Sequence, residues 1–162
     1  MILYDFCLKR IALWGNLAVG LAGGLAFVYG GLAVGRPTGA LVPAGFAFLF
    51  HLGREIVKDA EDISGDREAG AMTLPVRWGA RTAVACASGT FGLLIPLTFV
   101  PFCLGLYGWL YLAIVVLGVD LVLVYVVLSM WRNYSPSNLR RVSIVLKADM
   151  IVGLGAILAG RL

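Results

Sequence analysis

The sequence predicts an all-α protein, a polytopic membrane helix bundle with about five transmembrane helices. Of its 162 residues, 60% are hydrophobic and only 14% are charged, and the mean hydropathy is +0.93. A soluble domain would carry nearer a quarter of charged residues. Five segments are also apolar over close to the ~20 residues that a helix needs to cross a bilayer. We expect a single transmembrane domain, residues 1–162.

The predicted spans follow one another with short connections. The first, residues 11–35, is uncharged and dense in glycine and alanine, which let membrane helices approach closely. The second, residues 39–53, is by itself too short to cross the bilayer. We expect its helix to continue into the charged stretch that follows, leaving Asp59 to Asp66 at the water boundary. The remaining three spans are predicted at residues 82–103, 109–131 and 142–160.

Basic residues orient this bundle. Only Arg36 and Arg161 fall on the side opposite the N-terminus. The N-terminal side receives ten: Lys9, Arg10, Arg54, Lys58, Arg67, Arg77, Arg81, Arg132, Arg140 and Arg141. Such a bias places that side in the cytoplasm. We therefore expect a multi-pass protein of the cell membrane with its acidic stretch facing the cytoplasm. The net charge of +4 reports this topology and does not indicate nucleic acid as a partner. We also see no signal-peptide cleavage site.

Six of the nine acidic residues lie within fourteen positions: Glu55, Asp59, Glu61, Asp62, Asp66 and Glu68. On one continuous helix, four of them and His51 would share an arc of about 80°. Carboxylates at these spacings repel one another, so a cation should compensate them. Oxygen ligands suit Mg²⁺, which takes one or two carboxylates and leaves other positions to water and phosphates. The alternative is a helix end made soluble by mixed charges, in which Lys58 pairs with Glu55 or Asp62.

The stretch REIVKDAEDISGDREAGAMTLPVRWG resembles the second aspartate-rich motif of the UbiA superfamily of intramembrane prenyltransferases. The match covers the DxxDxxxD core, the Gly-Asp-Arg that follows and the Thr-Leu-Pro loop. YDFCLKR and SIVLKADMIVGLGAILAG resemble the family's cytoplasmic loop and last helix. The resemblance implies a partial UbiA-type fold, because family members have nine helices and nearly twice this length. We expect the chain to correspond to their C-terminal five helices, with a missing N-terminal half as a candidate partner.

The resemblance implies transfer of a polyprenyl group from a prenyl diphosphate to an acceptor, either a glycerol-phosphate lipid precursor or an aromatic ring. Within the family, the motif is more similar to that of the geranylgeranylglyceryl-phosphate transferases. The implied catalytic and Mg²⁺-binding residues are Asp59, Asp62 and Asp66. The implied diphosphate-binding residues are Lys9, Arg10 and Lys58, although the first two are equally typical of positive-inside anchoring. Two alternatives remain: a non-catalytic truncated relative, or a half-protein that needs a separate N-terminal partner. In either case the isolated chain would transfer little.

Weaker candidates lie elsewhere. Asp120, Lys147 and Asp149 are ionisable residues inside predicted spans, where such residues are functional candidates by default. They are too few and scattered to indicate a channel, and Lys147 can snorkel to the boundary. The only histidine, His51, is expected to be a packing residue more readily than a ligand. Tyr4 matches the family loop less securely. The three cysteines have no CxxC spacing and are expected to be small core residues.

Overall fold

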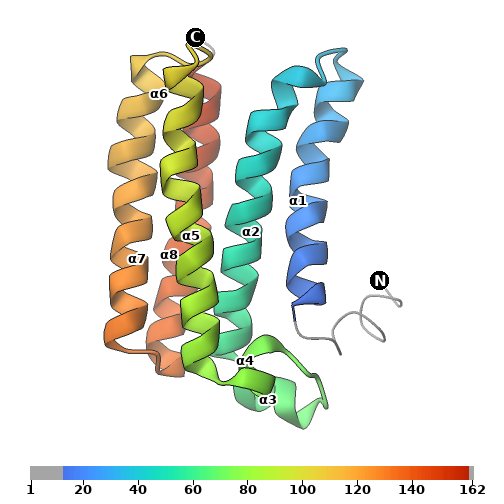
Figure 1. The fold of residues 1–162 in the computed structure, drawn as a ribbon, viewed down its shortest axis with the longest axis vertical. Coiled ribbons are helices and arrows are strands. Elements are labelled where there is room, and N and C mark those ends of the chain that lie inside the picture. Colours follow the sequence, from blue (N-terminus) through green and yellow to red (C-terminus); the bar gives the residue numbers. More distant parts are fainter. Residues whose placement is uncertain (1–12, 161–162) are drawn as a thin grey trace.

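The structure, a computed structural model, describes residues 13–160, and in this range it is helical with short connections (Figure 1). Five helical stretches are long and apolar enough to cross a membrane, which confirms the predicted all-α polytopic bundle. Their bounds are Trp14–Ala33, Thr38–Glu61, Ala80–Cys103, Trp109–Arg132 and Pro136–Ala159. The last begins earlier than predicted, because Pro136 occupies the first helical position, where a missing N–H has no cost.

Three of the spans are built mainly from one helix each, and the other two include a further element. A short 3₁₀ turn, Thr38–Ala40, precedes the second long helix, and a π-helical segment, Val115–Asp120, interrupts the fourth span. Two short helices, α3 and α4, connect the second and third spans. The helices are α1 (Trp14–Ala33), α2 (Leu41–Glu61), α3 (Ile63–Glu68), α4 (Leu74–Trp78), α5 (Ala80–Cys103), α6 (Trp109–Ile114), α7 (Leu121–Arg132) and α8 (Pro136–Ala159).

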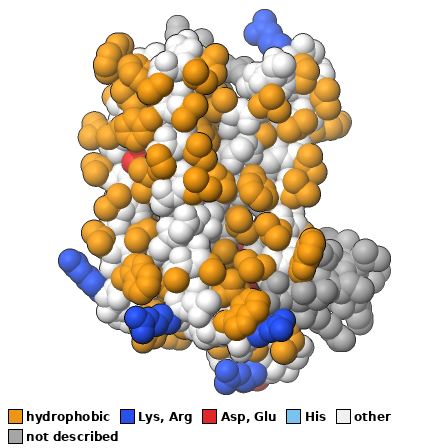
Figure 2. All heavy atoms as spheres, in the orientation of Figure 1, with side chains coloured by type: hydrophobic (Ala, Val, Ile, Leu, Met, Phe, Trp, Pro, Cys, Tyr) orange, Lys and Arg blue, Asp and Glu red, His pale blue; other side chains and the backbone are white. Residues whose placement is uncertain are grey.

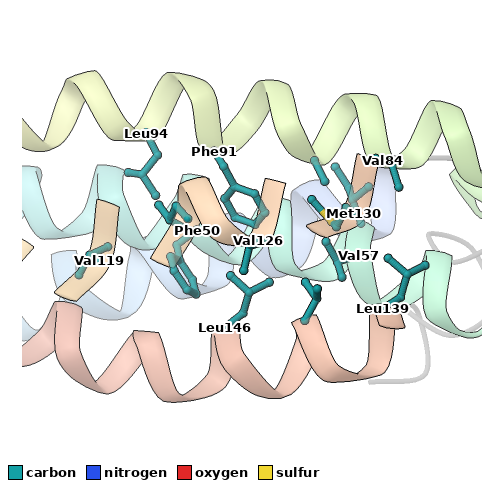
Figure 3. Packing of buried hydrophobic residues seen from close by; sticks show 14 of the residues in the cluster. Phe50, Val57, Val84, Phe91, Leu94, Val119, Val126, Met130, Leu139 and Leu146 are labelled. Carbon is teal, nitrogen blue, oxygen red and sulfur yellow. The ribbon is translucent and has the colours of Figure 1, made fainter. Parts of the chain in front are cut away.

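The hydrophobic core lies between α2, α5, α7 and α8 (Figure 3). Phe50 of α2 meets Phe91 of α5 with ring centroids 6.2 Å apart. Val126 and Met130 of α7 and Leu146 of α8 close the same core and are almost fully buried. Large apolar side chains also remain exposed on the outer faces of the helices, and Figure 2 shows them over much of one side of the molecule. This combination of a packed interior and an apolar exterior is what a bilayer-spanning bundle requires.

Helix α1 packs against α2 through glycines. A Cβ atom at Gly20 would lie 2.9 Å from the carbonyl oxygen of Phe48, and one at Gly24 would lie 2.9 Å from that of Ala44. Only hydrogen fits at these two positions, which are four residues apart as in GxxxG packing of membrane helices. The predicted role of the small residues in the first span, close helix packing, is therefore confirmed for this pair. The close approach matters because it carries Asn16 to the acidic end of α2.

The acidic stretch lies at one end of the bundle. In Figure 1, α3 and α4 cross the lower ends of the long helices, below the C-terminal end of α2. On the face drawn in Figure 2, most of the visible Lys and Arg side chains also lie around this lower end. The polar chemistry of the chain is thus concentrated at one boundary of the apolar region.

Candidate functional site

The helix of the second span continues into the acidic stretch as predicted, but only as far as Glu61, so the prediction of a single continuous helix through Asp66 is wrong. Helix α2 ends at Glu61, Asp62 adopts φ −110° and ψ 34°, and α3 begins at Ile63. A Cβ atom at Gly65 would lie 2.5 Å from Oδ1 of Asp62, so the Asp62 carboxylate folds back over Gly65. The shared arc of carboxylates consequently ends at Asp62, and Asp66 belongs to a separate helix.

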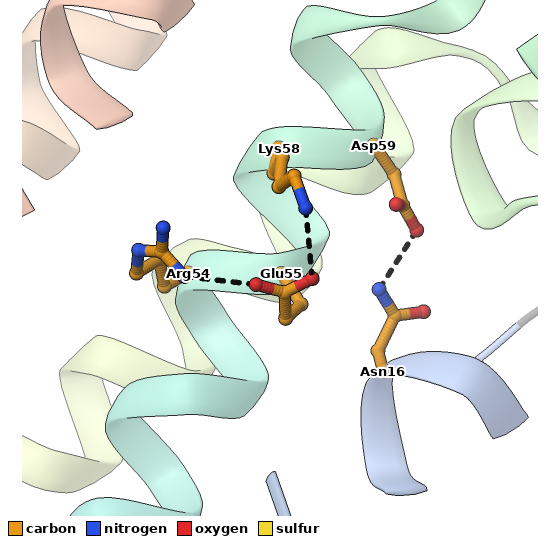
Figure 4. Close-up of polar contacts among 5 residues, drawn as sticks. All are labelled: Asn16, Arg54, Glu55, Lys58 and Asp59. Atoms are coloured by element: carbon orange, nitrogen blue, oxygen red, sulfur yellow. Dashed lines mark hydrogen bonds and ion pairs between the residues drawn. The ribbon is translucent and has the colours of Figure 1, made fainter. Parts of the chain in front are cut away.

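Asp59 points toward α1. The Asn16 side-chain Nδ2 donates a 2.7 Å hydrogen bond to Oδ2 of Asp59 (Figure 4). Asn16 is only 5% exposed, so this bond links two membrane helices in a largely water-free setting. Sequence reasoning missed Asn16. A signal was present, since an amide in an otherwise apolar span needs a hydrogen-bond partner.

Glu55 is held by cations of its own helix. Arg54 Nη1 lies 2.9 Å from Glu55 Oε1, and Lys58 Nζ lies 3.7 Å from Glu55 Oε2 (Figure 4). The intrahelical ion pair considered for Lys58 is therefore present, with Glu55 as the partner. The Lys58 side chain remains 58% exposed, and a single long pair at a surface contributes little to stability. Lys58 thus keeps donors that can turn toward a ligand.

The three aspartates of the DxxDxxxD core occupy different settings. Asp59 is bonded to Asn16, Asp62 is exposed, and Asp66 on α3 is only 5% exposed. Within residues 13–160, no group of three or more His, Cys, Asp or Glu side chains is arranged to hold a metal. A Mg²⁺ site here stays a prediction, one that relies on phosphate and water for part of the coordination shell.

Asp62 opens into a polar groove of about 500 Å³ between α2 and α8. Its charged lining consists of four cationic and two acidic side chains: Arg54, Lys58, Arg140, Lys147, Glu61 and Asp62. Lys147 had been predicted to snorkel to the membrane boundary, and it lines this groove. The contribution of α8, from Arg140 and Lys147, was not predicted. The two residues are seven apart and so lie on one face of the helix.

An apolar cavity of about 150 Å³ follows the groove along the same two helices. On α2 the groove ends at Arg54, and the cavity begins one turn further along, at His51. On α8 the groove ends at Lys147, and the cavity begins at Asp149. The cavity also reaches α5 and α6, and its walls are mostly hydrophobic side chains. A charged groove and an apolar cavity therefore follow one another along α2 and α8.

The remaining candidates divide between packing and hydrogen bonding. The ring of His51 sits directly against Gly23 of α1, where a Cβ atom would clash with it, in keeping with the expected packing role. Asp120 accepts a hydrogen bond from Thr98 Oγ1 at 3.1 Å, and the Tyr111 hydroxyl donates to the Thr98 carbonyl at 2.8 Å. Tyr4, Lys9 and Arg10 lie outside the described residues, so their predicted contacts stay predictions.

A sequence profile described as the UbiA prenyltransferase family matches residues 1–148. The chain belongs to the UbiA prenyltransferase family. It is 35% identical over 161 residues to digeranylgeranylglyceryl phosphate synthase of Methanothermobacter thermautotrophicus, covering 99% of this chain and 57% of the relative. It is 38% identical over 163 residues to the enzyme of the same name from Thermococcus gammatolerans, covering 100% of this chain and 58% of the relative.

The family's fold agrees with the architecture. A solved structure from work on digeranylgeranylglyceryl phosphate synthase in membranes matches with a TM-score of 0.90 and 28% identity. The match covers 98% of this chain and 56% of that one. The predicted partial UbiA-type fold is therefore confirmed. The chain spans little more than half the length of these UbiA-family relatives. They align with nearly all of it, however, and the comparisons give no support for a separate N-terminal partner.

Proposed function

We propose that this chain binds a prenyl diphosphate and takes part in transferring its prenyl group to an acceptor. The proposal rests on one observation: a cation-lined groove and an apolar cavity lie one after the other along α2 and α8. A prenyl diphosphate is divided in the same way, into an anionic head and an apolar tail. Family membership supports the same reading, and the comparisons do not favour a non-catalytic relative.

The groove supplies donors for the diphosphate head. Arg54 and Lys58 are paired with Glu55, whereas no ion pair is found for Arg140 or Lys147 among residues 13–160. An arginine offers a planar fork that can bind two phosphate oxygens at once, and a lysine offers a mobile point charge. The two α8 cations are therefore the groove residues best placed to gain a phosphate partner. Lys58 is the predicted diphosphate ligand that shares this groove, and we propose Lys9 and Arg10 as additional ones.

The same groove contains a carboxylate that could bind Mg²⁺ together with a substrate phosphate. Asp62 is exposed there, and Mg²⁺ is usually bound by one or two carboxylates plus substrate phosphates and water. We propose Asp62 as the direct ligand, with Asp59 and Asp66 completing the acidic set. When bound, Mg²⁺ would act as a Lewis acid on the diphosphate leaving group. Transfer breaks the bond between the prenyl carbon and the diphosphate oxygen, and the electron pair leaves with diphosphate.

The walls of the cavity protect the reacting carbon. Loss of diphosphate leaves allylic cation character on the prenyl group, which water would capture. Phe50, Leu94 and Val115 belong to an apolar lining that excludes water from the tail and from the carbon beside the head group. The chain's own contribution to the reaction is thus to bind the head, orient the tail and keep water away.

The relatives' name favours a glycerol-phosphate lipid precursor as the acceptor, with an aromatic ring as the second candidate. Both the prenyl donor and such an acceptor partition into the lipid bilayer, which is the medium of this five-span bundle. We propose that the groove faces the cytoplasm, because it is lined by four Lys and Arg side chains and α3–α4 lie at the end of the bundle where most visible basic side chains gather. Nucleic acid is not proposed as a partner.

Calorimetric titration of the purified chain with Mg²⁺ and geranylgeranyl diphosphate tests this proposal. Asp62→Asn should weaken Mg²⁺-dependent binding about tenfold or more, because a direct metal ligand is lost. Glu68→Gln is the matched control, an exposed acid on α3 outside the groove. Arg140→Gln should weaken diphosphate binding several-fold, whereas Arg141→Gln, its exposed neighbour outside the groove, should not. Equal affinities for Arg140→Gln and Arg141→Gln would contradict the assignment of the groove.

A further inference from the structure

Asp149 is a buried carboxyl group that the proposed transfer reaction has not used. It lies in the middle of α8, is 3% exposed and lines the apolar cavity. Neither Oδ1 nor Oδ2 has a hydrogen-bond partner among residues 13–160. The other two acidic side chains buried within the spans are satisfied, since Asp120 is bonded by Thr98 and Glu55 by Arg54. Asp149 is thus the exception.

Such a group is costly to keep. A buried polar group without a hydrogen bond is destabilising, and the cost is larger for a group that can carry charge. Ionisable residues inside the membrane usually mark a ligand or ion site for this reason. The cavity that Asp149 lines is the place where a partner can reach it. Three lining side chains could donate, but Thr98 donates to Asp120, Tyr111 donates to the Thr98 carbonyl, and His51 makes no hydrogen bond to Asp149.

The size and walls of the cavity define that partner. A cavity of about 150 Å³ with apolar walls is of the size that accommodates benzene, a molecule of six carbon atoms. A ligand of this size must be apolar where it touches the walls and polar at one point, opposite Asp149. A pure hydrocarbon would satisfy the walls and leave both carboxyl oxygens without a partner.

We infer that the cavity binds the hydroxyl-bearing end of a lipophilic alcohol, with Asp149 as the hydrogen-bond partner of the hydroxyl. A hydroxyl is both donor and acceptor, so it can pair with Asp149 whether the carboxyl group is ionised or protonated. An ammonium group would suit only the ionised form. Identifying this alcohol with the acceptor of the prenyl group rests on the proposed function. It assigns the cavity to the hydroxyl end of the acceptor beside the reacting carbon, so that most of the prenyl tail would lie outside the cavity. The binding of the alcohol itself does not rest on the proposed function.

The position of Asp149 agrees with such a role. Lys147, two residues earlier on α8, lines the head-group groove, and Met150, one residue later, lines the cavity with Asp149. A hydroxyl bound at Asp149 would therefore lie at the level along α8 where the groove gives way to the cavity, on a different face of the helix from Lys147. This arrangement would make Asp149 a determinant of specificity for hydroxyl acceptors.

A matched pair of small probes tests the inference: 3-methylbut-2-en-1-ol and its hydrocarbon isostere 2-methylpent-2-ene. Dissociation constants of both are measured for the purified chain in detergent by saturation-transfer NMR. The ratio of hydrocarbon to alcohol dissociation constants cancels much of the partitioning into micelles when variants are compared. Asp149→Val, similar in size to aspartate, should lower this ratio about fivefold, as expected for one lost hydrogen bond of ~1 kcal/mol. Asp149→Asn, which keeps a donor and an acceptor, should leave it within about twofold.

Thr90→Val is the control for loss of a polar group in a neighbouring span outside the cavity lining, and it should leave the ratio unchanged. Asp149→Ala serves as a second apolar variant if the valine variant does not fold. The same ratio in wild type and in both apolar variants, or no binding of the alcohol to wild type, would overturn the inference. Geranylgeranyl diphosphate binding that persists in that case would leave the proposed function standing.

Discussion

The hydrogen bond between Asn16 and Asp59 should be measurable as a coupling between α1 and α2. The Nδ2–Oδ2 distance of 2.7 Å is typical of a charge-assisted bond, and Asn16 is 5% exposed. Hydrogen bonds to charged groups contribute about 1.5–3 kcal/mol. Double-mutant cycles on hydrogen bonds between membrane helices, however, average ~0.6 kcal/mol and reach ~1.7. Because this bond is short and one partner is almost fully buried, we expect a coupling of about 1–1.7 kcal/mol.

The measurement is a double-mutant cycle of Asn16→Ala and Asp59→Ala. Unfolding free energies are obtained from reversible denaturation by sodium dodecyl sulfate in mixed micelles, followed by circular dichroism. A cycle of Asn16→Ala with Glu61→Ala, an acid at the end of α2 that lines the groove, is the control and should be additive. Independent substitutions usually add within about 0.3–0.5 kcal/mol. A coupling of Asn16 with Asp59 inside that range would refute the assigned bond.

Two further predictions concern helix packing and use the same unfolding assay. Gly24→Ala should destabilise the chain by about 1 kcal/mol or more, since overpacking costs about 1–3 kcal/mol and exceeds the gain in helix propensity. Gly30→Ala, in the same helix with no atom within 4 Å of its Cβ position, should be neutral or stabilising. Gly53→Ala should destabilise by a similar 1–3 kcal/mol, because its Cβ would lie 2.6 Å from the Phe91 ring; pairing it with Phe91→Leu should recover part of the loss.

The membrane architecture could be predicted because hydropathy alone decides it. A helix is the usual way for an isolated apolar segment to satisfy its backbone in lipid, so each apolar run of sufficient length predicts one span. The predicted third and fourth spans differ from the observed Ala80–Cys103 and Trp109–Arg132 by only a few residues. Span ends are less certain, because charged and proline-containing turns, such as the one at Pro136, can belong to the helix.

The geometry of the acidic stretch was harder to predict. The spacing of carboxylates is the same whether or not the helix is interrupted, so periodicity cannot detect the break at Asp62. Local composition carried the missing signal, because Asp62, Ile63, Ser64 and Gly65 form a run of residues with weak helix propensity. The groove could not be predicted either, since its cations on α8 lie some eighty positions after Asp62 in the sequence. Only tertiary packing brings the two together.

The π-helical segment Val115–Asp120 fixes the rotational phase of everything that follows it in the fourth span. A π-bulge can be described as one residue inserted into an α-helix, and one residue corresponds to about 100° of rotation. Removing Leu117 would delete the surplus residue and leave α7 in its present phase, whereas α-helical pairing of all six residues of the segment would swing α7 by that angle. Met130 would then leave the core, and Trp131 would lose its 3.0 Å hydrogen bond to Ser88 of α5. The π-helical turn thus determines which face of α7 packs against α5 and α8.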